Sequence, residues 1–188
     1  GETIAVWIMH TWEKLNKPDK FSLVELGPGR GILMHDITRV TRKYNSFFHS
    51  MSIHLIEVSP VLQNTQKQVL QDLNVKWHKD ICDIPEQPTI FLANEFFDSL
   101  PIDQFIYNNN LWYENKIARH DDNSLKVIQV EAINFYDNST TPDGAVVEVC
   151  KHGIEIIKKI EEKIYQNGGA ALIIDYGYVY PCYKSTLQ

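Results

Sequence analysis

The feature that most constrains the fold is a glycine-rich turn that follows a short apolar run. The run covers residues 21–26, and the turn reads Gly27-Pro28-Gly29-Arg30-Gly31. Glycine tolerates positive φ and lets a ligand reach the backbone, because no Cβ stands in the way. Parallel sheets bind ligands at such turns, at the carboxyl ends of their strands. A tight turn without any ligand is the alternative, and three glycines within five residues argue against it.

The rest of the chain alternates short apolar runs with segments of helical periodicity. This order is expected of a parallel sheet with helices on both faces. The strand-like runs cover 21–26, 52–58, 75–78, 89–94 and 170–175, and the helical segments cover 4–15, 32–44, 60–73 and 150–166. We therefore predict an α/β fold.

The pattern changes after Pro101. Residues 104–107 and 111–119 flank Asn108-Asn109-Asn110, which is a hairpin signal, and a further alternating strand follows at 125–132. We predict a single domain over residues 1–188 that carries a β-rich insertion over 102–149, after the fourth strand.

The spacing of the glycines selects among the ligands that such turns bind. A dinucleotide fingerprint places its third glycine one residue later than Gly31, and no Gly-Lys-Ser/Thr of a phosphate-binding loop follows. The acidic Glu25 stands just before the turn and fits a nucleoside with a charged amino-acid tail better than a pyrophosphate. We predict S-adenosylmethionine as the ligand, bound by Glu25, Gly27, Gly29 and Gly31.

Polar residues also end the next three strands, at the same edge of the sheet. Glu57 can accept hydrogen bonds from both ribose hydroxyls, or it can simply face solvent. Asp80 can accept from an adenine amino group, or it can cap a helix. Asn94 ends the fourth strand beside the expected methyl donor. We predict all three as cofactor contacts because they agree in their position in the fold.

Glu95 and Asp98 directly follow the fourth strand and are the candidate catalytic residues. Methyl transfer needs an aligned acceptor and a group that accepts its proton. An arginine guanidinium has a pKa above about 12, so carboxylates would have to hold it and deplete its charge. Phe96 and Phe97 could stack on the guanidinium, although a place in the core is favoured for both. Asp98 could also be a helix cap.

The remaining ionisable residues suggest no second site. Glu114 is interpreted as an exposed acid on the hairpin, and Asp175 either shapes the acceptor pocket or ends its strand. No metal site is expected, since the three cysteines are isolated and form no CxxC pair. We predict reduced thiols at Cys82, Cys150 and Cys182.

Charge and hydropathy exclude two classes of partner. The net charge is −6 and no dense Lys/Arg run occurs, which argues against nucleic acid. Residues 94–97 lie where amino methyltransferases of nucleic acids keep an Asn-Pro-Pro-aromatic segment, but both prolines are missing. No apolar stretch approaches the roughly 20 residues that span a bilayer, so we expect no membrane insertion.

Four segments, taken in chain order, resemble the MidA-like family of S-adenosylmethionine-dependent methyltransferases: VELGPGRG, HLIEVSP, ANEFFDSLPIDQF and ALIIDYGY. The resemblance runs from GETIAVW nearly to the last residue and implies a Rossmann-like class I methyltransferase sheet. It implies cofactor contacts at Gly27, Gly29, Gly31 and Glu57, with Glu95 and Asp98 near the acceptor.

The family includes a mitochondrial complex I assembly factor that methylates arginine on a complex I core subunit. The resemblance thus implies a protein arginine methyltransferase that acts on a respiratory-complex subunit, in a bacterial cytoplasm or a mitochondrial matrix. The alternative is a non-catalytic, cofactor-binding assembly factor whose insertion grips a partner through Trp112 and Tyr113, unless these belong to the insertion core. Family members extend beyond both ends of the match, so we expect a truncated sheet whose open edge favours a homodimer.

Overall fold

A computed structural model describes residues 1–133, 135, 141–178, 180 and 182–186. The chain forms two compact units. The first unit comprises Gly1–Ser99 and Glu155–Tyr176, and the second comprises Leu100–Ile154 and Gly177–Gln188. The predicted insertion 102–149 falls within the second unit.

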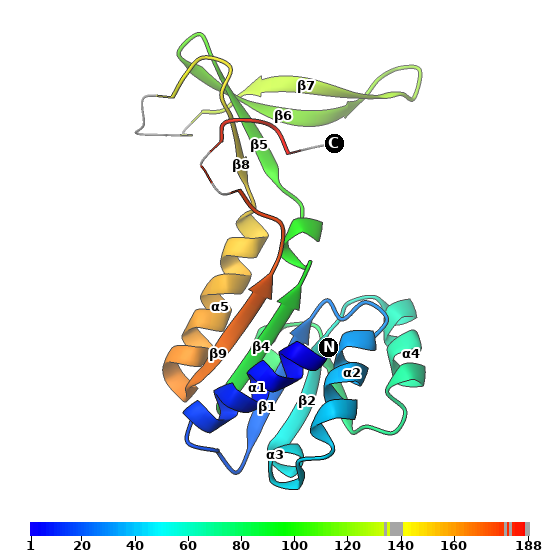
Figure 1. Cartoon of the computed structure of the whole chain (residues 1–188). Helices are drawn as coiled ribbons and strands as arrows, with labels where there is room; N and C mark the ends of the chain where they lie inside the picture. The colour runs from blue at the N-terminus through cyan, green and yellow to red at the C-terminus, as the bar shows by residue number, and fades with distance from the viewer. Residues whose placement is uncertain (134, 136–140, 179, 181, 187–188) are drawn as a thin grey trace. The chain divides into compact units, whose positions relative to one another are not determined.

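A five-stranded parallel sheet forms the centre of the first unit, with the strand order β3-β2-β1-β4-β9 (Figure 1). The strands are β1 (Phe21–Leu26), β2 (Met51–Ile56), β3 (Val75–His78), β4 (Thr89–Asn94) and β9 (Gly169–Ile174). The chain moves outward from β1 to β3 and then returns to pair β4 with the other side of β1. The strand order therefore reverses beside β1, which places the ligand-binding edge at its carboxyl end.

Five helices accompany these strands: α1 (Glu2–Lys14), α2 (Ile32–Thr41), α3 (Asn45–Ser50), α4 (Pro60–Val69) and α5 (Lys151–Asn167). Helix α4 begins where its sequence predicts, because Pro60 occupies the first turn and the Ser59 hydroxyl accepts from the Leu62 N–H at 3.4 Å. Helix α2 ends three residues earlier than predicted, and α3 was not predicted. None of the described helices combines the length and the apolar character that a membrane span requires.

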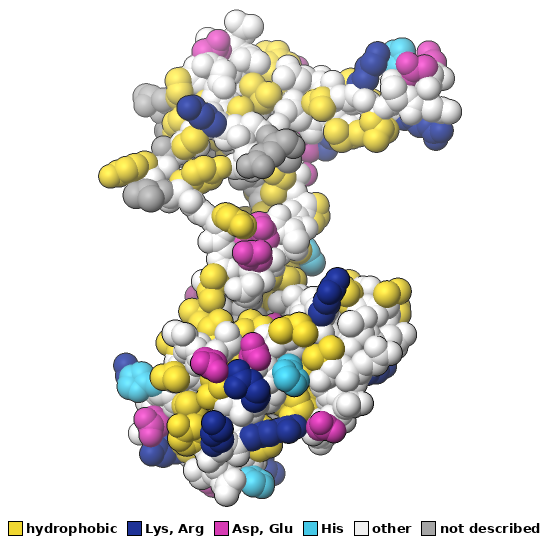
Figure 2. Space-filling model, turned by 45° about the vertical axis from the view of Figure 1, so that its right-hand side comes forward, with side chains coloured by type: hydrophobic (Ala, Val, Ile, Leu, Met, Phe, Trp, Pro, Cys, Tyr) yellow, Lys and Arg dark blue, Asp and Glu magenta, His cyan; other side chains and the backbone are white. Residues whose placement is uncertain are grey.

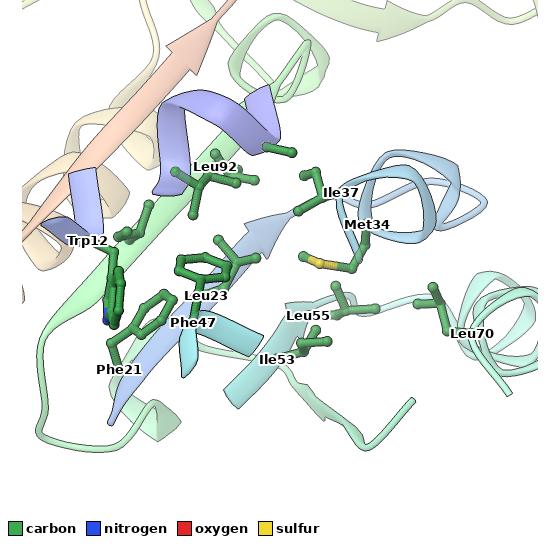
Figure 3. Close-up of a cluster of buried hydrophobic side chains, with 13 residues drawn as sticks. Trp12, Phe21, Leu23, Met34, Ile37, Phe47, Ile53, Leu55, Leu70 and Leu92 are labelled. Carbon is green, nitrogen blue, oxygen red and sulfur yellow. The ribbon is translucent and has the colours of Figure 1, made fainter. Parts of the chain in front are cut away.

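The hydrophobic core explains why the extra helix α3 forms. Phe47 of α3 lies against Trp12 and Phe21, with ring centroids 5.4 Å apart in both pairs. Leu23 and Leu92 extend the same cluster along the sheet (Figure 3). Burial of Phe47 against residues distant in sequence thus stabilises a six-residue helix that would not persist alone.

An antiparallel sheet with the order β7-β6-β5-β8 forms the second unit. Its strands are β5 (Asp103–Asn108), β6 (Leu111–Arg119), β7 (Leu125–Glu131) and β8 (Val146–Val149). The predicted hairpin is confirmed, since Asn109 and Asn110 both have positive φ, as its two-residue turn requires. Strand β8 was not predicted, because four residues carry little pattern and the strand is defined by its pairing with β5.

Trp112 and the strand β7 differ in exposure. Trp112 is only 8% exposed and packs on Tyr107 at 5.1 Å, so it belongs to the insertion core and not to an exposed patch. Every described side chain of β7 is exposed, and Val127 pairs there with Ile117 of β6. Figure 2 shows apolar side chains at the surface of this unit.

Candidate functional site

The glycine turn joins β1 to α2 and has the backbone conformation that its sequence predicts. Gly27, Gly29 and Gly31 have φ values of 58°, 53° and 82°, so a side chain at any of them would be strained. A Cβ on Gly27 would lie 2.6 Å from a ring carbon of Phe96, whereas a Cβ on Gly29 would meet nothing within 4 Å. The space beside Gly29 is therefore free for a ligand to approach the backbone.

Glu57 follows β2 and is brought to the same edge. The Gly27 N–H donates to the Ile56 carbonyl at 3.1 Å, which ties the turn to the end of β2. One oxygen of the buried Glu57 carboxylate accepts from the Ser59 N–H at 2.8 Å, and the other accepts from the side-chain amide of Gln66 at 3.2 Å. Each oxygen keeps a second lone pair, so the carboxylate can still accept from two hydroxyls.

Glu25 has a buried carboxyl group with one oxygen that lacks a hydrogen-bond partner among the described residues. Its side chain is 3% exposed, and Oε2 has no hydrogen-bond partner in the described part of the chain. Burial raises the pKa of Glu25 to about 8. A buried carboxyl oxygen without a partner is costly, and a cationic or hydrogen-bonding group of a ligand would remove that cost. Glu25 thus fits the ammonium group of an amino-acid tail.

Asp80 is already engaged by the protein. Its Oδ1 accepts from the Cys82 N–H at 2.8 Å and caps the short 3-10 helix Ile81–Asp83, while Lys159 of α5 lies 2.6 Å from Oδ2. The hydrogen bond from the Cys82 backbone, together with Lys159, holds the pKa of Asp80 well below its usual range. The helix-cap alternative is therefore correct, and the adenine contact stays a prediction.

Asn94 ends β4, and Glu95 and Asp98 follow in the next loop; all three residues are exposed. Glu95 has a φ of 48°, a left-handed conformation that costs energy for a residue with a side chain. Its N–H donates to the Ile174 carbonyl of β9 at 2.8 Å. Asp175, rather than Asp98, caps the following turn, because it accepts from the backbone of residues 97 and 98.

Phe96 and Phe97 do not join the core. Both rings are half-buried, meet edge to face with centroids 5.2 Å apart, and stay near the surface because their loop lies at the edge of the sheet. Phe96 lies against Gly27. The aromatic pair therefore borders the glycine turn, where stacking on a planar acceptor group stays a prediction.

Sequence reasoning missed Gln66, which is fully buried on α4 and bonds to both Glu57 and the Gly29 carbonyl. Helix α4 carries three glutamines, Gln63, Gln66 and Gln68, and nothing in the local sequence shows which of them is buried. Glu114, predicted as an exposed acid, is half-buried on β6 and pairs with Lys116. A hollow of about 740 Å³ between α1 and α3 contains none of the predicted site residues, so it is not the site. The described residues include no cluster of three or more His, Cys, Asp or Glu able to hold a metal.

Three comparisons with known proteins bear on the family and the fold of this chain. The family model "Putative S-adenosyl-L-methionine-dependent methyltransferase" matches residues 3–188. The chain is 35% identical to the mitochondrial protein arginine methyltransferase NDUFAF7 of Danio rerio and 32% identical to that of Homo sapiens. These alignments cover 95% of this chain but 49% and 47% of the relatives, so the chain spans about half their length.

Solved structures from Burkholderia thailandensis share the fold. One superposes with a TM-score of 0.75 over 94% of this chain and 48% of its own. A second, solved with S-adenosyl-homocysteine bound, superposes with a TM-score of 0.73 over 94% of this chain and 46% of its own. Both are 16% identical in sequence, so they establish the fold alone.

Proposed function

This chain belongs to the family of S-adenosyl-L-methionine-dependent methyltransferases, and from that premise we propose that it transfers a methyl group to a protein side chain, arginine being the favoured acceptor. The observation that carries the donor half is the buried carboxyl of Glu25, whose Oε2 has no hydrogen-bond partner in the described part of the chain, near the end of the strand that leads into the glycine turn. When bound, the cofactor supplies a methyl group on a positively charged sulfur.

The donor would be held by groups at the carboxyl ends of β1 to β4. The Gly29 backbone would lie against the ligand, Glu57 would accept from the ribose hydroxyls, and Glu25 would accept from the ammonium group of the tail. Gly27 and Gly31 would set the path of the turn. Asp80 would accept from the adenine amino group through a lone pair that its present partners leave open, and Asn94 would border the donor.

The acceptor would be held by the two exposed carboxylates of the loop after β4. Glu95 and Asp98 would orient a guanidinium. Glu95 would accept the proton that the attacking nitrogen loses as it bonds to the methyl carbon, while the bond from that carbon to the donor sulfur breaks and its electron pair stays on sulfur. The relatives are named mitochondrial protein arginine methyltransferases, which supports arginine as the acceptor and a mitochondrial location. A respiratory complex I subunit is the substrate that we propose, in the matrix for a eukaryotic chain and in the cytoplasm for a bacterial one.

Titration calorimetry of the protein with S-adenosylmethionine tests the donor half. We expect binding in the micromolar range that Gly29→Val abolishes, because valine is strained at a φ of 53° and fills the free space. Gly168→Val is the matched control: Gly168 has a φ of 77° and nothing within 4 Å of its Cβ position, but it precedes β9, at the opposite edge. A folded wild type that binds no ligand would contradict the proposal.

Glu95→Gln tests the acceptor half. The variant should abolish methyl transfer, as detected by mass spectrometry of the partner protein. It should leave cofactor binding unchanged, as measured by calorimetry.

The alternative function, a non-catalytic assembly factor, is favoured by the exposed apolar strand β7. This alternative predicts that a partner binds equally to wild type and Glu95→Gln and gains no methyl group.

A homodimer would cover the side of β9 that faces away from β4, since β9 pairs with β4 alone among the described strands.

A further inference from the structure

The side chain of Gln66 is fully buried, and all of its polar atoms are engaged. The Trp77 indole N–H donates to Oε1 at 2.8 Å. Nε2 donates to the Gly29 carbonyl at 2.8 Å and to Glu57 Oε2 at 3.2 Å. Because an indole nitrogen is only a donor, Trp77 fixes which end of the amide is the oxygen. The amide nitrogen must therefore face the glycine turn and the Glu57 carboxylate.

The Gln66 side chain links helix α4 to the glycine turn and to the end of β2, and these segments would surround the cofactor. Gly29 is the residue whose backbone is open to a ligand, and Glu57 is the acid at the end of β2. The Ser59 N–H holds one oxygen of Glu57 and Gln66 holds the other, so the orientation of the carboxylate is set from both sides. A Cβ on Gly31 would lie 3.4 Å from the Gln66 side chain, which shows how closely α4 packs on the turn.

We infer that Gln66 is a positioning residue of the donor site, which orients Glu57 toward the ribose and fixes the turn at Gly29. The inference rests on the proposed function, since it concerns how the cofactor is held. Gln66 touches no ligand itself and acts through these two groups. The two N–H groups of the amide serve two acceptors at once, the Gly29 carbonyl and Glu57 Oε2.

The test is the substitution Gln66→Glu, with Trp77→Phe as its matched control. Glutamate keeps the shape and the acceptor for Trp77, but it replaces the amide donor with an oxygen that faces two other oxygens. Phenylalanine at position 77 keeps an aromatic ring but removes the indole donor, so Gln66 Oε1 loses its partner while both Nε2 contacts stay possible. The measurements are the Kd for S-adenosyl-homocysteine by calorimetry and the melting temperature without ligand.

We expect Gln66→Glu to raise the Kd by at least about tenfold, the loss that follows removal of a charge-assisted hydrogen bond, and Trp77→Phe to raise it less than about threefold. A 2′,3′-dideoxy analogue of S-adenosyl-homocysteine separates positioning from general destabilisation. Wild type should prefer the natural ligand, and Gln66→Glu should lose most of this preference because the preference depends on Glu57.

Two results would overturn the inference while the donor site stands. One is a Kd of Gln66→Glu within about twofold of wild type. The other is a weaker Kd with an unchanged preference for the ribose hydroxyls, which would make Gln66 a residue of structural importance only. If wild type itself does not bind S-adenosyl-homocysteine, the proposed function fails first and the inference fails with it.

Discussion

The carboxylate of Asp175 accepts a hydrogen bond from the backbone N–H of Phe97 at 2.9 Å, although 78 residues separate the two in sequence. The same oxygen accepts from the Asp98 N–H at 3.2 Å, and the neighbouring Ile174 carbonyl accepts from the Glu95 N–H. The end of β9 thus holds the loop after β4 at three backbone positions. One of these positions carries the strained backbone of Glu95.

Removing this support should loosen the loop. Asp175→Ala should raise amide hydrogen exchange in residues 95–99 by about tenfold or more, because the amides of residues 97 and 98 lose their acceptor. Asp175→Asn keeps one acceptor oxygen and should restore most of the protection. Exchange in β1, measured in the same experiment, should not change. Equal protection of the loop in wild type and Asp175→Ala would show that Asp175 does not hold it.

The left-handed backbone at Glu95 should be visible in the stability of paired variants. Glu95→Gly and Glu95→Ala both remove the carboxylate, but only glycine adopts a φ of 48° without steric cost. We expect the glycine variant to have the larger free energy of unfolding, by about 1 kcal/mol, in urea denaturation. If the alanine variant is as stable or more stable, the backbone at this position is not strained in solution.

Glu25 should release a proton to the solvent when the cofactor binds. Its pKa is raised to about 8 by burial, so the carboxyl is mostly protonated at about pH 7 before binding. An ammonium group placed beside it would lower this pKa and release close to one proton, which calorimetry in two buffers of different ionisation enthalpy detects. Glu25→Gln should bind without this release. If the wild type releases no proton on binding, Glu25 does not contact the ligand ammonium.

A pair of histidines, of which His54 is buried and His78 half-buried, should make the protein less stable in acid. His54 Nδ1 lies 2.9 Å from His78 Nε2, and burial lowers the pKa of His54 from 6.5 to about 4. Because the folded pKa lies below the unfolded one, the stabilisation is complete above pH 6.5 and is lost as the pH falls toward 4. The loss should approach about 3 kcal/mol.

Urea unfolding at both ends of that pH range checks this prediction against His54→Gln, which cannot titrate. The wild type should lose more stability than the variant on acidification. His10→Gln, at an exposed position of α1, is the control and should behave like wild type. Equal losses in wild type and His54→Gln would assign the acid sensitivity to other groups.

The parallel sheet could be predicted well because its strands are short apolar runs bounded by turns. The predicted bounds of β1, β3 and β4 are confirmed. Helix α3 and strand β8 escaped prediction because tertiary contacts define them: one depends on the burial of Phe47 and the other on pairing with β5.

The part of the candidate site that lies at the ends of strands could be predicted from the sequence. Glu25, Glu57 and Glu95 all lie at or directly after the carboxyl ends of strands, where the fold brings them to one edge. Gln66 was not predicted, and Asp175 was left between shaping the acceptor pocket and ending its strand, since their hydrogen bonds reach 37 and 78 residues along the chain. Local pattern cannot show which distant backbone group a buried amide or a strand-end acid will meet.

The contact between Gly27 and Phe96 has a consequence for genetics. A Cβ at Gly27 would collide with the Phe96 ring, whereas one at Gly29 would collide with nothing in the protein. An allele that replaces Gly29 should therefore strain the turn and impair cofactor retention, without displacing another side chain. An allele that replaces Gly27 should also displace the loop that carries Glu95, so its phenotype would combine two defects and could not be rescued by supplying more cofactor.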